Sequence, residues 1–224
     1  MKRSEINAVI RKFEALLDKY SFALPPFLSW TPEEWQTKGH EYDEIRDNML
    51  GWDVTDYGMG QFDTLGLALI TIRNGNVHNP KYTKCYAEKI MMCDEGQVSP
   101  MHFHWNKMED IINRGGNDII FQFYNANKET EEFEDTDVLI CQDGRQSKMP
   151  AGSKVVLHPG ESMTLYPYLY HEFIIPEGGP SLIGEVSMTN DDNTDNRFYN
   201  PLGRYPTIEE DEPPYRLLCN EYPP

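Results

Sequence analysis

Two histidines separated by one residue, with a glutamate shortly after them, form the pattern in this sequence with the clearest chemical meaning. His102 and His104 lie in the run SPMHFHW, and Glu109 follows across a short polar stretch. Side chains two positions apart point the same way from a β-strand but not from a helix. Imidazole nitrogens and carboxylate oxygens bind divalent transition metals. The pattern therefore predicts a metal site on a strand, with an ordinary hydrogen-bonded or surface histidine pair as the alternative.

A third histidine, His171, occupies a later strand-like run, SMTLYPYLYHEFII. Unpaired imidazoles among apolar residues are costly to bury, which favours a shared ligand role for the three histidines over separate structural ones. The other histidines, His40, His78 and His158, have no partner at ligand spacing. We expect these to be structural or exposed.

The first part of the chain predicts helices. Apolar residues recur at helical spacing over residues 1–20, which is typical of an amphipathic helix, and Ser4 is its predicted N-cap. The run TPEEW predicts a second helix start, with Thr31 as the cap and Glu34 completing a capping box. A further helical segment is predicted over residues 41–50.

From Leu65 onward the pattern changes to short apolar or alternating runs separated by Gly, Pro, Asn and Asp. Such runs at regular spacing are typical of an antiparallel barrel or a double-sheet jelly roll. We therefore predict a mainly β protein that forms one domain over residues 1–224. Its predicted parts are a helical N-terminal extension at 1–60, a barrel at 61–205 and an acidic, Pro-rich C-terminal arm at 206–224.

Composition narrows the class of protein. A chain of 224 residues with 39% hydrophobic and 12% aromatic content is typical of a folded domain. The net charge of −17 argues against nucleic acid or an anionic membrane as a partner. Charges interrupt every apolar run near the start, which argues against a secretory signal or a membrane span. The four cysteines form no C-x-x-C pair, so we expect reduced, mostly buried thiols, a cytoplasmic location and no zinc–thiolate site.

The histidine–glutamate run resembles a known family motif. The first motif of the cupin superfamily is reproduced in full by Gly96, His102, His104, Glu109 and Gly116. The second motif is looser: Gly160 and His171 have the family spacing, but Pro167 is one place late and Tyr168 stands where a glycine is expected. The resemblance implies a cupin fold, that is, a double-stranded β-helix or jelly-roll barrel with the N-terminal helices packed outside. It also implies one metal ion held by His102, His104, Glu109 and His171.

The chain also resembles a narrower group, the D-lyxose isomerases. The resemblance rests on the runs HFHWNKMEDIINRGG and GEVSMTNDDNTDNRF together with the long helical N-terminus. It implies a metal-dependent aldose–ketose isomerase that interconverts D-lyxose and D-xylulose, and D-mannose and D-fructose, through a cis-enediol. It further implies a homodimer built on barrel strands and the N-terminal segment. Ligation by imidazole and carboxylate fits Mn²⁺ first, with Co²⁺, Fe²⁺, Ni²⁺ or Zn²⁺ as substitutes.

An isomerase of this kind needs a base near the metal that is not itself a ligand. Glu185 is the first candidate, because it lies in the apolar strand-like run SLIGEVSM, where an unpaired carboxylate is costly. Lys89, in AEKIMM, is similarly placed and is predicted to donate a proton to a sugar oxygen or to stabilise its charge. The alternatives are a salt-bridged or outward-facing glutamate and a lysine that extends along the surface to solvent.

Three further residues are candidates for binding sugar hydroxyls. Lys107 lies inside the first motif, and Asp192 and Arg197 lie in NDDNTDNRF, which is predicted to form a loop at the mouth of the site together with Asp195. The alternatives are a solvated lysine and a turn held by Asx hydrogen bonds.

Two other functions fit the same ligands. A three-histidine, one-glutamate site also holds Fe²⁺ in cupin dioxygenases, although the polar residues near this motif favour a hydroxyl-rich substrate. The second alternative is a non-catalytic sugar-binding cupin that retains the metal without the base.

Overall fold

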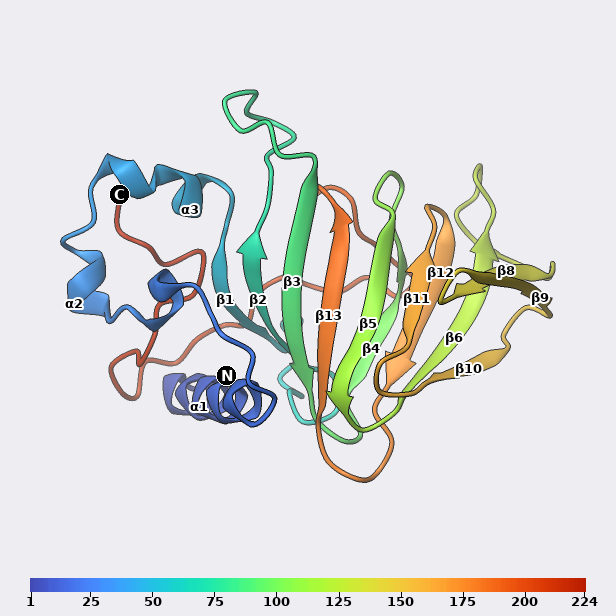
Figure 1. Ribbon diagram of the computed structural model, residues 1–224, viewed down its shortest axis with the longest axis horizontal. Coiled ribbons are helices and arrows are strands. Elements are labelled where there is room, and N and C mark those ends of the chain that lie inside the picture. The colour runs from blue at the N-terminus through green and yellow to red at the C-terminus, as the bar shows by residue number, and fades with distance from the viewer.

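The computed structural model describes residues 1–224, and two curled antiparallel sheets make up most of it (Figure 1). The larger sheet has eight strands in the order β1-β2-β3-β13-β5-β11-β8-β9. Their bounds are Gly51–Thr55 (β1), Leu67–Arg73 (β2), Tyr86–Cys93 (β3), Ser181–Met188 (β13), Glu109–Gly116 (β5), Ser162–Leu165 (β11), Val138–Gln142 (β8) and Arg145–Met149 (β9).

The second sheet has the order β10-β6-β12-β4-β14, and the short strand β7 pairs with β6. The bounds are Lys154–Leu157 (β10), Ile119–Ala126 (β6), Leu169–Ile174 (β12), Val98–Phe103 (β4), Arg197–Phe198 (β14) and Phe133–Glu134 (β7). On β6, the buried Ile119, Phe121 and Phe123 alternate with less buried residues, as expected for a strand with one face toward a core. These side chains pack with residues of β5, β12 and β13 into an apolar cluster inside the barrel. The predicted mainly β, cupin-type fold is confirmed.

Short helices gather at one end of the molecule, beside β1 (Figure 1). They are α1 (Arg3–Lys19), the 3₁₀ turn η1 (Pro26–Ser29), α2 (Pro32–Trp35), the 3₁₀ turn η2 (His40–Tyr42) and α3 (Asp43–Asp47). The apolar stripe of α1, including Ile6, Ile10 and Phe13, packs in one cluster with Trp52 of β1 and Ile70 of β2. The helices therefore cover the outside of the larger sheet, as predicted. No helix combines the length and the apolar character needed to cross a membrane.

The helix boundaries differ from the sequence prediction in detail. The capping box of Thr31 and Glu34 is confirmed at the start of α2. The predicted N-cap at Ser4 is wrong: Lys2 is the N-cap residue of α1, and the Ser4 hydroxyl instead donates to Asp211, 2.6 Å away. The helical segment predicted for 41–50 is shorter: α3 spans Asp43–Asp47, and Met49, with a φ of 54°, lies beyond its end. β1 pairs with β2 along its whole length, so the sheet starts inside the predicted N-terminal extension.

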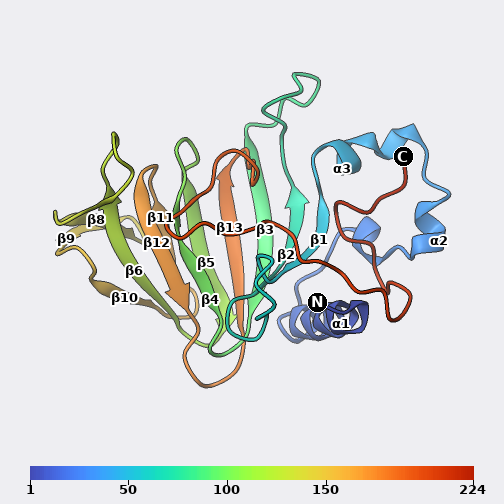
Figure 2. The same ribbon diagram turned by 180° about the vertical axis from the view of Figure 1, so that it is seen from behind.

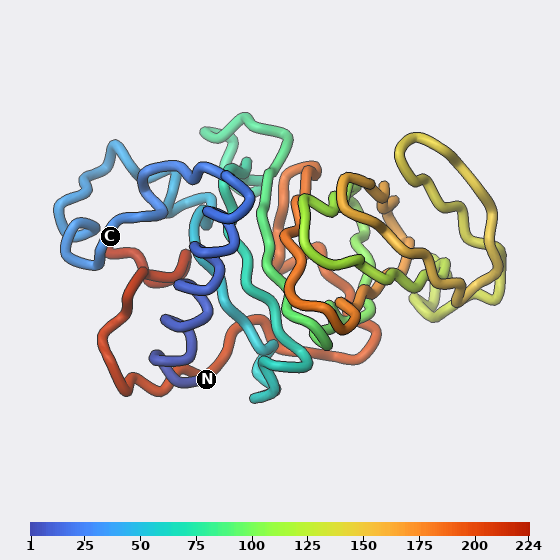
Figure 3. The backbone as a smooth tube through the Cα atoms, turned by 60° about the horizontal axis from the view of Figure 1, so that its bottom comes forward, coloured from blue at the N-terminus to red at the C-terminus, as the bar shows by residue number.

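The C-terminal segment returns to the helices. After β14 the chain crosses from the barrel to the helical end (Figure 2) and lies beside α1 (Figure 3). The Arg3 guanidinium, only 3% exposed, forms ion pairs with Glu210 and Glu221, and Tyr222 stacks on Trp35 with ring centroids 3.9 Å apart. The predicted arm thus joins the two ends of the chain, and it contributes buried as well as surface residues.

Candidate active site

The four residues predicted to bind a metal converge inside the barrel. β4 carries His102 and is followed by His104, β12 carries His171, and β5 begins with Glu109. His171 is paired in register with His102 across β4 and β12. The candidate ligand nitrogens of the three histidines all lie within 4.8 Å of one another. Strand pairing therefore brings together residues that are far apart in the sequence.

The orientation of the three imidazoles suits a metal. Each Nδ1 lies at hydrogen-bond distance from a backbone carbonyl: 2.7 Å from Pro100 O for His102, 2.7 Å from Asp195 O for His104, and 2.9 Å from Leu169 O for His171. A carbonyl oxygen only accepts hydrogen bonds, so Nδ1 carries a proton, and in the neutral imidazole Nε2 then keeps its lone pair. Metal-binding histidines are commonly fixed in this way.

Glu109 completes the cluster. Its Oε1 lies 3.2 Å from His104 Nε2 and 3.5 Å from His171 Nε2. Its Oε2 is buried and forms an ion pair with the Lys107 ammonium at 2.6 Å, without any other partner. Three imidazoles whose Nε2 atoms converge beside a buried carboxylate are a donor set that fits a divalent transition metal.

The electrostatic environment keeps His102 and Glu109 in the protonation states that a metal requires. Burial lowers the pKa of His102 well below its usual range, and the neighbouring His171 and His104 lower it further. Burial alone would raise the pKa of Glu109, but Lys107 and His104 hold it well below its usual range. The imidazole is therefore neutral and the carboxylate ionised near neutral pH.

A buried run of alternating charges leads away from the cluster. Lys107 Nζ lies 3.1 Å from Glu185 Oε1, and Lys89 Nζ lies 3.6 Å from the same oxygen. Glu185 of β13 and Lys89 of β3 are partners in the register of the two strands. Burial opposes the charge of Lys107, but Glu109, Glu185 and Asp192 raise its pKa, so that it stays an ammonium ion.

The run continues to Asp192 and Arg204. Lys89 Nζ lies 3.3 Å from Asp192 Oδ1, and Arg204 Nη2 lies 3.2 Å from Asp192 Oδ2. Arg204 also pairs with Asp53 of β1. Although burial alone would raise the pKa of Asp192, Lys89, Arg204 and Lys107 hold it well below its usual range.

One cavity contains nearly all the predicted site residues. It has an empty volume of about 630 Å³, counting the part open to solvent. The predicted residues that line it are His102, His104, Glu109, His171, Lys89, Glu185, Lys107 and Asp192. Arg197 is not among them: its Nε donates to Glu131 Oε2 at 2.8 Å. The placement therefore gives no support to the substrate contact predicted for Arg197, whose neighbour Phe198 lines the cavity instead.

The sequence prediction missed several residues of the site. Arg204 and Tyr57 line the cavity from irregular segments, in runs that carry no periodic signal. Asp53, the ion-pair partner of Arg204, could have been found from the sequence, because it is the only charged residue in the buried strand GWDVT. The remaining histidines, His40, His78 and His158, are exposed and face aspartates, in agreement with the prediction that they lie outside the site.

The two-sheet barrel, with a histidine–glutamate cluster inside it, defines a cupin-type protein. The chain belongs to the D-lyxose isomerase family, whose family model matches residues 1–222. It is 48% identical over 224 residues to the D-lyxose/D-mannose isomerase of Escherichia coli O157:H7, covering 99% of this chain and 98% of the relative. It is 46% identical to the Serratia proteamaculans protein of the same name, again covering 99% of this chain and 98% of the relative.

Solved structures agree on the fold. L-ribose isomerase from Geodermatophilus obscurus superimposes with a TM-score of 0.64 at 14% identity, covering 93% of this chain and 98% of that one. The Cellulomonas parahominis L-ribose isomerase with L-ribose gives a TM-score of 0.62 at 15% identity, with the same coverage of each chain. The family model and the two relatives identify the chain as a sugar isomerase, which sets aside the dioxygenase and the non-catalytic binding module.

Proposed function

We propose that this protein interconverts D-lyxose and D-xylulose, and D-mannose and D-fructose, in a metal-dependent reaction. The observation that carries the proposal is the position of the Glu185 carboxylate, which two lysine ammonium groups flank beside the histidine–glutamate cluster. The substrates are those in the names of the relatives at 48% and 46% identity.

His102, His104, Glu109 and His171 are the proposed ligands of Mn²⁺, with Co²⁺, Fe²⁺, Ni²⁺ or Zn²⁺ as substitutes. When bound, a divalent cation supplies a Lewis acid that polarises the sugar carbonyl. The fit rests on the convergence of the three histidine side chains within 4.8 Å and on Glu109 Oε1, which lies 3.2 and 3.5 Å from two of their Nε2 atoms.

The protein's own residues then move the protons. Glu185 removes the proton from C2 of the aldose, or from C1 of the ketose, and returns it to the neighbouring carbon through a cis-enediol. Lys107 and Lys89 lie on either side of this carboxylate and stabilise the negative charge that develops on the sugar oxygens. Asp192 and Arg204, at the far end of the charged run, are placed to bind the more distant hydroxyls.

The decisive test of this function is metal removal followed by reloading with single metals. We expect chelator-treated protein to be inactive, and Mn²⁺ to restore formation of D-xylulose from D-lyxose and D-fructose from D-mannose. The measurement is ketose formation over a panel of pentoses and hexoses, with each metal tested separately. Full activity after complete metal removal, or no ketose from any sugar with any metal, would contradict the proposal.

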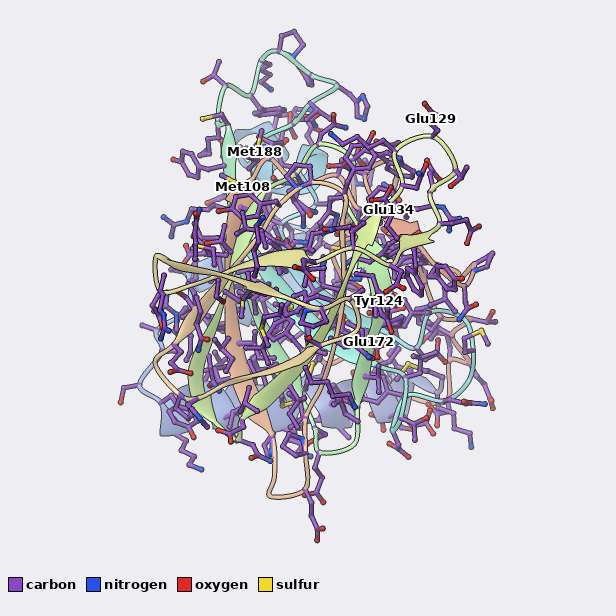
Figure 4. The ribbon with its side chains drawn as sticks, turned by 90° about the vertical axis from the view of Figure 1, so that its right-hand side faces the viewer. Met108, Tyr124, Glu129, Glu134, Glu172 and Met188 are labelled. Carbon is purple, nitrogen blue, oxygen red and sulfur yellow. The ribbon has the colours of Figure 1, made fainter.

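We also propose a homodimer formed through barrel strands and the N-terminal segment. α1 covers the part of the outer sheet face that carries Ile90 and Leu182. Beyond it the same face remains apolar and open, with Tyr86, Val186 and Met188 exposed by 48%, 46% and 49%. Met108 extends this patch: its carbonyl accepts the Met188 amide, and the two side chains lie together at the surface (Figure 4). Exposed apolar patches of this kind mark protein interfaces.

Sedimentation tests the dimer. We expect a dimer at micromolar concentration and a shift toward monomer when both Val186 and Met188 are replaced by lysine, because two desolvated charges oppose association. Val156→Lys is the control, since Val156 is 39% exposed on β10 of the second sheet and its replacement is expected to leave the dimer intact. A monomeric parent protein would contradict the proposal.

A further inference from the structure

The turn between His104 and Glu109 has backbone hydrogen bonds only at its ends, where the His104 carbonyl accepts from the Tyr168 amide and the Met108 carbonyl from the Met188 amide, each at 3.0 Å. β4 ends at Phe103 and β5 begins at Glu109, so the residues between them lie outside the strand ladders. The amides of Asn106 and Lys107 instead donate to the two carboxylate oxygens of Asp195, Oδ1 and Oδ2, each at 2.9 Å. The Asn106 side-chain amide donates to Oδ1 as well, at 3.2 Å. A single distant carboxylate therefore holds the middle of this turn.

The same residue also orients one of the proposed metal ligands. The backbone carbonyl of Asp195 lies 2.7 Å from His104 Nδ1 and fixes the tautomer that leaves Nε2 free. Asp195 is 8% exposed. It contacts the cluster through both its backbone and its side chain, although the hydrogen-bonded residues are about 90 positions apart in the sequence, with separations of 91 and 88 for His104 and Lys107.

The loop that carries Asp195 also contacts the two lysines of the site. Asn190 Oδ1 accepts from Lys89 Nζ at 2.8 Å and from Lys107 Nζ at 3.2 Å. The loop is closed on itself by the Asp195 amide, which donates to the Asp191 carbonyl at 3.0 Å. Loss of the Asp195 carboxylate would therefore free the backbone of Lys107 and shift its ammonium group relative to Glu185 and Asn190.

We propose that Asp195 is a positioning residue, which sets the separation of His104 and Glu109 and holds Lys107 against Glu185. A carboxylate is suited to this role because it only accepts hydrogen bonds and has two oxygens for two backbone N–H groups. Buried N–H groups left without a partner are costly, so the turn would rearrange rather than keep its shape without Asp195. This inference rests on the proposed metal site, and it goes further by assigning the geometry of that site to a residue outside it.

The test compares two aspartates of one loop. Asp195→Asn keeps the size of the side chain and the backbone carbonyl. Its NH₂ group replaces one carboxylate oxygen, so one of the two backbone N–H groups loses its acceptor. Asp191→Asn is the matched control, because Asp191 accepts from the amides of Asn193 and Thr194 and has no bond to the turn. We expect Asp195→Asn to weaken Mn²⁺ binding by about 10–100-fold, the usual effect of losing a residue that supports a ligand. We expect Asp191→Asn to stay within about threefold of the parent protein.

Mn²⁺ affinity is measured by competition with a chromophoric chelator, and kcat and KM for D-lyxose are measured at saturating Mn²⁺. We expect kcat to fall by about 10-fold or more in Asp195→Asn even with the metal bound, because Lys107 is displaced. A purely structural role would instead lower only the melting temperature. Mn²⁺ affinity and kcat both within threefold of the parent would overturn the proposal. Loss of Mn²⁺ affinity in Asp195→Asn would uphold it even in a protein that isomerised none of the sugars tested.

Amide hydrogen exchange of the parent protein provides a second measurement that needs no variant. The Asn106 and Lys107 amides lie in no strand, yet their bonds to a buried carboxylate predict slow exchange comparable to that of the flanking strands. Exchange of both amides at the rate of an unstructured peptide would overturn the proposal, whether or not Asp195→Asn folds.

Discussion

Replacement of Glu185 by glutamine is expected to lower the turnover number by about 10²–10⁴-fold, the usual contribution of a positioned general base. The amide has nearly the same shape as the carboxylate and cannot take up a proton. Because Glu185 is not one of the proposed ligands, bound metal is expected to remain at the parent level. The measurements are kcat for D-lyxose and metal content per chain.

A matched control lies on the neighbouring strand. Glu88 of β3 is next to Lys89 in the chain, but its side chain points to the other face of the sheet and pairs with Arg73 at 2.9 Å. Glu88→Gln is therefore expected to retain turnover within about threefold, because the exposed pair it breaks contributes little. Comparison of the two variants separates the loss of a base from the loss of one negative charge on the sheet.

Deuterium incorporation distinguishes the two routes by which hydrogen moves between the carbons. If Glu185 carries the proton, part of it exchanges with solvent, and the reaction in D₂O places deuterium at C2 of the aldose or C1 of the ketose. A hydride shift places none there. We expect incorporation; its absence, together with a Glu185→Gln variant that turns over near the parent rate, would contradict the role of this carboxylate as the base.

Replacement of His171 by alanine is expected to remove metal and activity together. His171 is 2% exposed, and its Nε2 faces Glu109 Oε1 at 3.5 Å, so its removal deletes one donor from the middle of the cluster. Loss of a residue that only supports a ligand costs about 10–100-fold in metal affinity, and loss of the ligand itself is expected to cost more. The measurement is Mn²⁺ affinity beside kcat; the same outcome is expected, to differing degrees, for His102, His104 and Glu109.

His158→Ala is the control for the loss of an imidazole. His158 is exposed and pairs with Asp118, far from the cavity, so its removal is expected to leave Mn²⁺ affinity and kcat unchanged. A His171→Ala variant with parental metal content and turnover would remove this histidine from the site. Together with Glu185→Gln, the pair of experiments separates metal binding, which fails in one variant, from proton transfer, which fails in both.

Three of the proposed metal ligands could be placed together from the sequence because their pattern is local. His102 and His104 alternate on one strand, and Glu109 follows at a spacing that a single turn imposes, so short-range geometry fixes their relation. The helix that begins at Thr31 was likewise set by a capping box within a few residues. Glu185 and Lys89 were detectable as charges in apolar strands, since burial of an unpaired charge is costly wherever the strand lies.

Local patterns failed where the partner was distant or the segment irregular. Arg197 was predicted at the cavity, but β14 pairs with β4 and brings its side chain to Glu131 instead. Ser4 has the side-chain chemistry of an N-cap residue. In the structure it lies within α1, one residue after the helix begins, and its hydroxyl donates to Asp211 of the C-terminal segment.

The sequence by itself determined the strand and helix periodicity, the metal-ligand motif and the lone charges that an apolar strand must satisfy. Only the tertiary structure decided which charges meet. Lys107 reaches Glu185 across 78 positions, and Arg204 reaches Asp53 across 151. These contacts depend on the order in which β13 is inserted between β3 and β5 and on the path of the C-terminal segment. The physical reason is that hydrogen bonding and side-chain period act over a few residues, whereas the pairing of buried charges is fixed only when the sheets close around them.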